Sequence, residues 1–173
     1  MTSRIIRNII RFIGFVLLQS LILKSVDLSF GEFDYFKVIV FHLFILLLPL
    51  NMPRWAILVS AFLIGISVDF FYDSPGVHAS AALFTAYLRK PVLKYLEPQG
   101  GYNVNEIPSL HYFDLSWIII YTSILTLAHF LWYFSMEAFS FVYFFEIILN
   151  TIFSFLISVI FILIYQLIIR PKN

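Results

Sequence analysis

The 173-residue sequence has no cysteine and few charged residues. The absence of cysteine excludes disulfide bonds, thiolate metal sites and cysteine nucleophiles. Only 12% of the residues are charged, whereas 61% are apolar and 20% aromatic, and the mean hydropathy is +0.94. A soluble domain carries about 25% charged and about 45–50% apolar residues. The composition therefore excludes an ordinary globular enzyme, a disordered tail and a nucleic-acid-binding protein, and it indicates a membrane protein.

Long apolar runs fill most of the chain. A helix needs about 20 largely apolar residues to cross the hydrocarbon core, and turn-forming residues such as Pro49, Pro53 and those at 73–76 interrupt the runs. The interruptions leave six expected spans, at residues 5–23, 36–50, 55–72, 77–96, 115–134 and 139–169. We therefore expect one multi-pass domain over residues 1–173, an all-α integral membrane protein built as a bundle of six transmembrane helices.

The basic residues indicate the orientation, because Lys and Arg concentrate on the cytoplasmic side of membrane proteins. With the N-terminus inside, only Lys24 and Lys37 lie outside. The other nine of the eleven basic residues lie inside, namely Arg4, Arg7, Arg11, Arg54, Arg89, Lys90, Lys94, Arg170 and Lys172. The sequence thus predicts that both ends are cytoplasmic. Basic residues of this group either anchor the protein, with apolar stems in lipid and charged heads at the anionic leaflet, or only set the topology; the expected anchors are Arg54, Arg89, Lys90 and Lys94.

Small residues recur three or four positions apart on both sides of the turn at 73–76. The third span carries Ala61, Gly65 and Asp69, and the fourth carries Ala79, Ala82 and Ala86. Because small residues let helix backbones approach closely, this spacing predicts a tight helical hairpin. A carboxylate costs about 2.5–3.5 kcal/mol in hydrocarbon. We expect Asp69 to accept hydrogen bonds from His78 or from the N–H groups of the turn, or else to be solvated at the interface.

Polar side chains also repeat with helical spacing in the last two spans. The last span carries a stripe of four, Glu146, Asn150, Ser154 and Ser158. The stripe predicts a contact line to another helix or to a partner; alternatively, Glu146 sits at the outer interface and the serines bond to their own helix. One face of the fifth span carries Thr122, Thr126, His129 and Tyr133. That face favours interhelical hydrogen bonding over a proton or substrate path.

Sequence patterns of catalysis are missing. We find no nucleophile elbow, HExxH motif, phosphate-binding glycine loop or carboxylate pair with glycosidase-like spacing. No two of the four histidines have the spacing of metal ligands. We therefore expect a non-enzymatic protein with no catalytic residue, no metal and no cofactor.

A longer pattern covers the third and fourth spans. It begins with Pro49-Leu-Asn-Met-Pro53-Arg-Trp55 and ends with Ala86-Tyr87-Leu88-Arg89. Between them lies a glycine-x-x-x-aspartate pair followed by a short turn, with Gly65, Asp69, Asp73, Pro75, Gly76, His78 and Ala79 as its marked positions. This pattern, over about residues 49–96, resembles the core of the rod shape-determining protein MreD family.

The resemblance implies a scaffold of the cell-elongation machinery in the bacterial inner membrane. Members of the family associate with the bitopic membrane protein MreC, and through it link the MreB filament to peptidoglycan synthesis by RodA and penicillin-binding protein 2. The resemblance also implies a fold like that of the substrate-binding subunits of energy-coupling-factor transporters. The alternative function is therefore a vitamin-type, small-molecule binding subunit of a transporter, with polar residues of the third, fifth and sixth spans lining its pocket.

Overall fold

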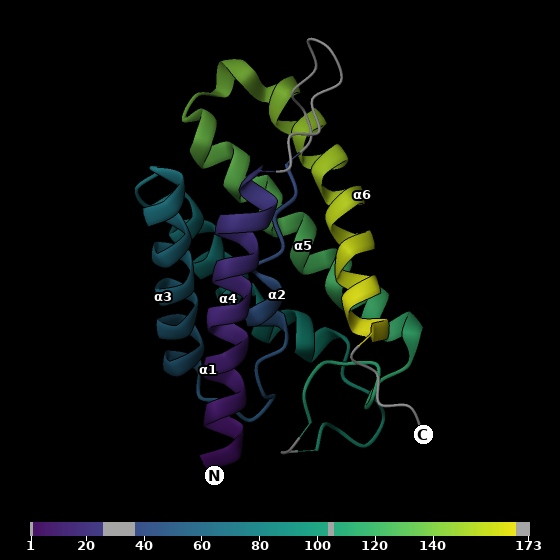
Figure 1. Ribbon diagram of the computed structural model, residues 1–173. Helices are drawn as coiled ribbons and strands as arrows, with labels where there is room; N and C mark the ends of the chain where they lie inside the picture. The colour runs from purple at the N-terminus through teal and green to yellow at the C-terminus, as the bar shows by residue number, and fades with distance from the viewer. Residues whose placement is uncertain (1, 26–36, 104–105, 169–173) are drawn as a thin grey trace.

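The computed structural model describes residues 2–25, 37–103 and 106–168 (Figure 1). Within these residues the secondary structure is helical and contains no β-strand, which confirms the predicted all-α class. Four of the described stretches are long and apolar enough to cross a membrane, namely Ile6–Ser25, Arg54–Tyr72, Leu115–Ala138 and Phe144–Ile168. The architecture is consistent with an α-helical membrane protein.

The elements alternate in direction along the chain. In order they are α1 (Thr2–Leu17), a π-helical turn (Leu18–Ile22), a 3-10 turn (Leu23–Ser25), α2 (Leu43–Leu46), α3 (Arg54–Tyr72), α4 (Val77–Tyr95), α5 (Leu115–Ala138), a 3-10 turn (Phe141–Tyr143) and α6 (Phe144–Ile168). Helices α3 and α4, α4 and α5, and α5 and α6 pack as successive neighbours. α1 begins at the end of the bundle where α3 begins and α6 ends (Figure 1).

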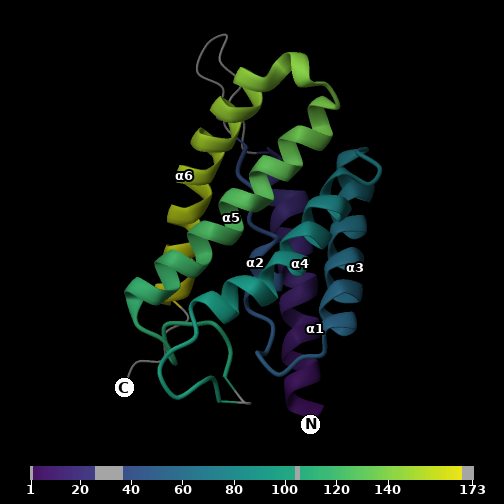
Figure 2. The same ribbon diagram turned by 180° about the vertical axis from the view of Figure 1, so that it is seen from behind.

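The centre of the bundle is the segment 37–50, which is mostly not helical. α2, its only helical part among the described residues, is a single turn of four residues. The segment runs between α1 and α5, as Figures 1 and 2 show from opposite sides. Every residue from Val38 to Leu48 is at most 5% exposed. The segment is thus the most deeply buried continuous stretch of the described chain.

The expected helix over 36–50 is therefore wrong for the part that the structure describes, residues 37–50. The run Val38-Ile39-Val40-Phe41 is β-branched and aromatic, residue types with lower helix propensity. Pro49 ends the segment. Side chains from neighbouring helices bond the backbone that a helix would have satisfied internally. The expected start of this span at Phe36 lies outside the described residues, as do Arg170 and Lys172.

The surface of the bundle is strongly apolar, although the interior contains many polar residues. Large apolar side chains point outward along α1, α3, α5 and α6, for example Ile10 at 64%, Phe70 at 82% and Ile160 at 57% exposure. Fourteen polar or charged residues, by contrast, are buried within the described chain. This is the distribution that lipid imposes, because lipid offers polar groups no hydrogen-bond partner.

Candidate functional site

The last turn of α3 carries a carboxylate that caps the next helix. The Asp69 side chain is buried, and its Oδ1 accepts hydrogen bonds from Ser74 Oγ (3.1 Å), from the His78 backbone N–H (2.9 Å) and from His78 Nδ1 (3.0 Å). Oδ2 accepts from the N–H groups of Gly76 (3.1 Å) and Ala79 (2.9 Å). The carboxylate thus satisfies backbone donors at the start of α4 that have no intrahelical partner, and it fixes the turn from α3.

Backbone strain at this turn explains two marked positions of the pattern. Gly76 has φ +89° and Asp73 has φ +53°, so both lie in the left-handed region. Glycine adopts this region without steric cost, and aspartate is among the few other residues that tolerate it. Pro75, between them, is exposed. The turn is therefore shaped by its backbone and by the Asp69 bonds.

One turn earlier, α3 and α4 are in direct backbone contact. A Cβ added at Gly65 would lie 2.4 Å from Ala79 Cα, 2.8 Å from Ala79 N and 2.9 Å from the His78 carbonyl oxygen. No side chain fits in this space, so Gly65 permits the close packing that brings Asp69 within reach of the α4 N-terminus. The structure therefore joins the marked residues of the 65–79 pattern into one hairpin.

The central segment is held from one side by Gln19, in the π-helical turn after α1. Gln19 is fully buried. Its Nε2 donates to the Val38 carbonyl (3.1 Å), and its Oε1 accepts from the Val40 N–H (2.8 Å). Tyr72 contacts the same side chain, with 2.9 Å between its Oη and Gln19 Nε2. A single amide thus replaces backbone partners that the non-helical segment lacks.

The polar stripe of α6 holds the same segment from the other side. Ser154 Oγ accepts from the Lys37 N–H (3.0 Å), and Ser158 Oγ accepts from the Ile39 N–H (3.2 Å). The stripe therefore contacts the extended backbone at two of its four positions. Glu146 is exposed and Asn150 is half-buried, and both line a hollow of about 200 Å³ beside Glu137.

Two histidines stack at the middle of the bundle. The rings of His42, which precedes α2, and His129 in α5 lie 4.4 Å apart between centroids and are nearly parallel. His42 Nε2 lies 3.0 Å from Thr126 Oγ1, and His129 Nδ1 lies 2.9 Å from Thr85 Oγ1. These bonds join α5 to the central segment and to α4, as interhelical hydrogen bonding would. The sequence did not indicate that residues 42 and 129 meet.

The other two polar residues predicted on this face of α5, Tyr133 and Thr122, differ in whether they form a hydrogen bond. Tyr133 Oη donates to Glu137 Oε1 (3.1 Å), and Lys37 forms an ion pair with the same oxygen (2.6 Å). Thr122 is buried, and its Oγ1 has no hydrogen-bond partner among the described residues.

Arg89 is not a membrane-surface anchor, contrary to the expectation from sequence. It is 1% exposed, its Nε donates to Tyr121 Oη (3.1 Å), and its Nη2 donates to the Leu48 carbonyl. Tyr121 Oη in turn donates to the Leu46 carbonyl (3.0 Å). The guanidinium thus donates to a backbone carbonyl at the end of the central segment. Pro49 interrupts helical structure there, so no helical N–H provides this hydrogen bond.

The other three expected anchors are exposed. Lys90 and Lys94 lie at the end of α4, and the Arg54 guanidinium lies 4.7 Å from the centre of the Tyr87 ring. These positions suit side chains that reach a polar surface.

The loop after α4 and the first turn of α5 each contribute one aromatic donor to the end of α4. Tyr102 Oη donates to the Leu93 carbonyl (2.7 Å), and Trp117 Nε1 donates to the Leu96 carbonyl (2.8 Å). Burial raises the pKa of Tyr102 to about 12, so its hydroxyl stays protonated and remains a donor at neutral pH. These bonds satisfy carbonyls at the α4 C-terminus.

Sequence reasoning missed Gln19, Tyr121 and the burial of Arg89. Gln19 did carry a signal, because a polar residue in an apolar span tends to face the protein interior. Most of the buried polar side chains described above bond backbone groups or one another. Among the described residues, no group of three or more His, Asp or Glu side chains is placed to hold a metal ion.

Comparison of the chain with known protein families, with curated proteins and with solved structures gives no match.

Proposed function

We propose that this protein is a non-enzymatic scaffold of the bacterial cell-elongation machinery, a multi-pass protein of the inner membrane with both ends in the cytoplasm. In this role it binds MreC, and through MreC it helps to couple the MreB filament to peptidoglycan synthesis by RodA and penicillin-binding protein 2. The proposal takes its partners from the resemblance of residues 49–96 to the MreD family.

The observation that carries the proposal is the α3–α4 hairpin. The residues that bear the resemblance, from Gly65 to Ala79, meet in space through one backbone contact and one five-bond carboxylate cap. The glycine and the aspartate of the pattern therefore act at one helix contact, which supports a structural role for the residues that carry the resemblance.

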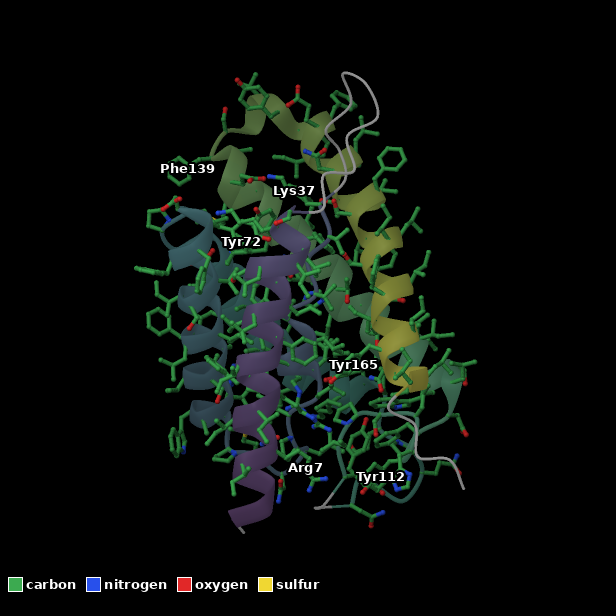
Figure 3. The ribbon with its side chains drawn as sticks, viewed as in Figure 1. Arg7, Lys37, Tyr72, Tyr112, Phe139 and Tyr165 are labelled. Atoms are coloured by element: carbon green, nitrogen blue, oxygen red, sulfur yellow. The ribbon has the colours of Figure 1, made fainter. Side chains whose placement is uncertain are left out.

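Two further features support a binding role in the membrane. The outward faces of α1, α3 and α6 carry large apolar side chains, onto which a single transmembrane helix of a partner could pack. Arg7 lies at one end of the bundle and the Lys37–Glu137 pair at the other (Figure 3). With α1 beginning where α6 ends, this fits six passes with both ends at the basic, cytoplasmic side.

Co-purification from native membranes tests the proposal. Tagged wild-type protein should recover MreC in a stoichiometric complex identified by mass spectrometry. Gly65→Leu should lower the protein level or the recovery of MreC, because the hairpin cannot close around a leucine. Gly14→Leu is the matched control for the protein level, since a Cβ at Gly14 meets nothing within 4 Å. MreC recovery that Gly65→Leu leaves unchanged would count against the role of the hairpin, and no MreC with the wild-type protein would contradict the scaffold.

A second candidate function is a vitamin-type binding subunit of a transporter. It is favoured by the buried interior, where non-helical backbone lies beside ring nitrogens of His42, His78 and His129 that have no hydrogen-bond partner among the described residues. In transporters, such backbone often lines the substrate site. A ligand that remains with the purified protein, or thermal stabilisation by a vitamin, would support this function. A stoichiometric complex with a bitopic coiled-coil protein would support the scaffold.

A further inference from the structure

A basic hollow of about 250 Å³ lies at the end of the bundle where α1 begins and α6 ends. Arg7 and Arg11 of α1 form one wall, and Tyr165 and Gln166 of α6 form another. The segment 107–112 closes the third side. Figure 3 shows Arg7, Tyr112 and Tyr165 gathered at this end of the molecule. The volume lies below the roughly 300–1,000 Å³ of pockets for drug-sized ligands, so the hollow suits a small group.

Among the described residues, the two arginines have no counter-charge in the hollow. They are four residues apart on one face of α1, where like charges repel. No carboxylate lines the hollow, and no ion pair of Arg7 or Arg11 is present within the described part of the chain. An anion bound between the two guanidinium groups would relieve this repulsion.

Ser109, which lines the hollow, carries a polar group without a partner among the described residues. This group, the side-chain Oγ, is buried. Gln166, 5% exposed, donates only a long bond of 3.4 Å, to the Pro108 carbonyl. A buried hydroxyl without a partner is unfavourable, and an oxygen-rich anion in the hollow would provide the missing acceptor.

The surface next to the hollow is apolar. Beyond Arg7, the adjoining face of α1 exposes Ile10 at 64%. The acyl chains of an amphiphile with its headgroup between the arginines could pack on this side chain. Basic pockets between transmembrane helices on the cytoplasmic side are known to take anionic headgroups.

We propose that this hollow binds a phosphate group, through bidentate contacts from Arg7 and Arg11 and a hydrogen bond from Ser109. Planar guanidinium groups match phosphate oxygens in this way. The phosphate is that of an anionic phospholipid of the cytoplasmic leaflet or a free phosphate ion. The inference does not depend on the proposed scaffold function, because it rests on the residues of the hollow alone.

Thermal melting of the purified full-length protein tests the site. The protein is held in neutral detergent in phosphate-free buffer, and its Tm is measured with phosphatidylglycerol, with diacylglycerol of the same acyl chains, and with inorganic phosphate against chloride of equal ionic strength. Phosphatidylglycerol at about ten times its Kd should raise the Tm by about 3–5 °C, and diacylglycerol should not. A rise with inorganic phosphate alone would identify the ion, rather than the lipid, as the source of the phosphate.

Variants decide whether the effect belongs to the hollow. Arg11→Gln and Arg7→Gln should abolish the rise, and Ser109→Ala should reduce it. Lys90→Gln is the matched control, because it removes the same charge from an exposed side chain outside the hollow. Arg7 is exposed, so its substitution tests the site even where Arg11→Gln does not fold. The proposal is overturned if neither phosphate source raises the Tm, or if Arg7→Gln retains the rise to the same extent as Lys90→Gln.

Discussion

Substitution of Gly65 by alanine places one methyl group where two backbones touch. The new Cβ would lie 2.4 Å from Ala79 Cα and 2.8 Å from Ala79 N, and backbone atoms cannot rotate away as a flexible side chain can. Overpacking typically costs about 1–3 kcal/mol. Alanine recovers about 0.5–1 kcal/mol, because it favours the helix over glycine. The difference of these ranges is about 0–2.5 kcal/mol. Because the closest contacts are with backbone atoms, we expect a net destabilisation of about 1–2 kcal/mol, accompanied by a shift of α4 that lengthens the bonds to Asp69.

Size-exclusion chromatography after heating, with fluorescence detection, measures this effect in detergent. A change of 1–2 kcal/mol corresponds to a Tm lower by about 2–8 °C for a chain of this length. Gly14→Ala makes the same chemical change in α1, where a Cβ meets nothing within 4 Å, and should leave the Tm equal or slightly higher. If both alanine variants melt at the wild-type temperature, the backbone contact does not limit the packing of α3 on α4 and the reasoning is refuted.

Four further outcomes follow from the buried bonds and the orientation. Asp69→Leu should lower the Tm more than Asp69→Asn, because the amide oxygen still accepts some of the five bonds; equal losses would contradict this. Arg89→Gln should destabilise by about 1.5–3 kcal/mol, the range for bonds from a charged group, whereas Lys90→Gln should change the Tm by less than about 1 °C. Ser158→Ala should destabilise measurably by removing the acceptor of a buried N–H, and an unchanged Tm would show that water replaces it. In this cysteine-free chain, a membrane-impermeant maleimide should label Glu137→Cys in intact spheroplasts and Lys90→Cys only after permeabilisation; labelling of both from one side would disprove the proposed orientation.

The α3–α4 hairpin could be predicted from sequence because its evidence is local. Gly65 and Asp69 lie one turn apart, and a strong turn signal follows at 73–76. Small residues at helical spacing then leave one way for the two helices to pack closely. The number of hydrogen bonds to Asp69 could not be predicted from the sequence. The backbone N–H groups and the His78 side chain reach the carboxylate only when Asp73 and Gly76 adopt their left-handed conformations.

The central segment could not be predicted because its pattern carries no period. From Val38 to Leu48 nearly every residue is apolar, so a buried helix and a buried extended chain look alike. The deciding information lies far away in the chain, at Gln19 and in α6. Arg89 was misplaced for the same reason, since its acceptor, the Leu48 carbonyl, exists only because the segment is not a helix.

These long-range bonds explain why polar residues occur in such an apolar chain. An unsatisfied backbone group in hydrocarbon costs several kcal/mol, so a non-helical segment can lie at membrane depth only where protein surrounds it and bonds it. Gln19, Ser154, Ser158 and Arg89 each bond the backbone of this segment. They come from the π-helical turn after α1, from α6 and from α4, so three parts of the bundle bond one buried segment. Loss of any one of these side chains should therefore loosen the helix that carries it as well as the segment, which ties the packing of the whole bundle to a few hydrogen bonds.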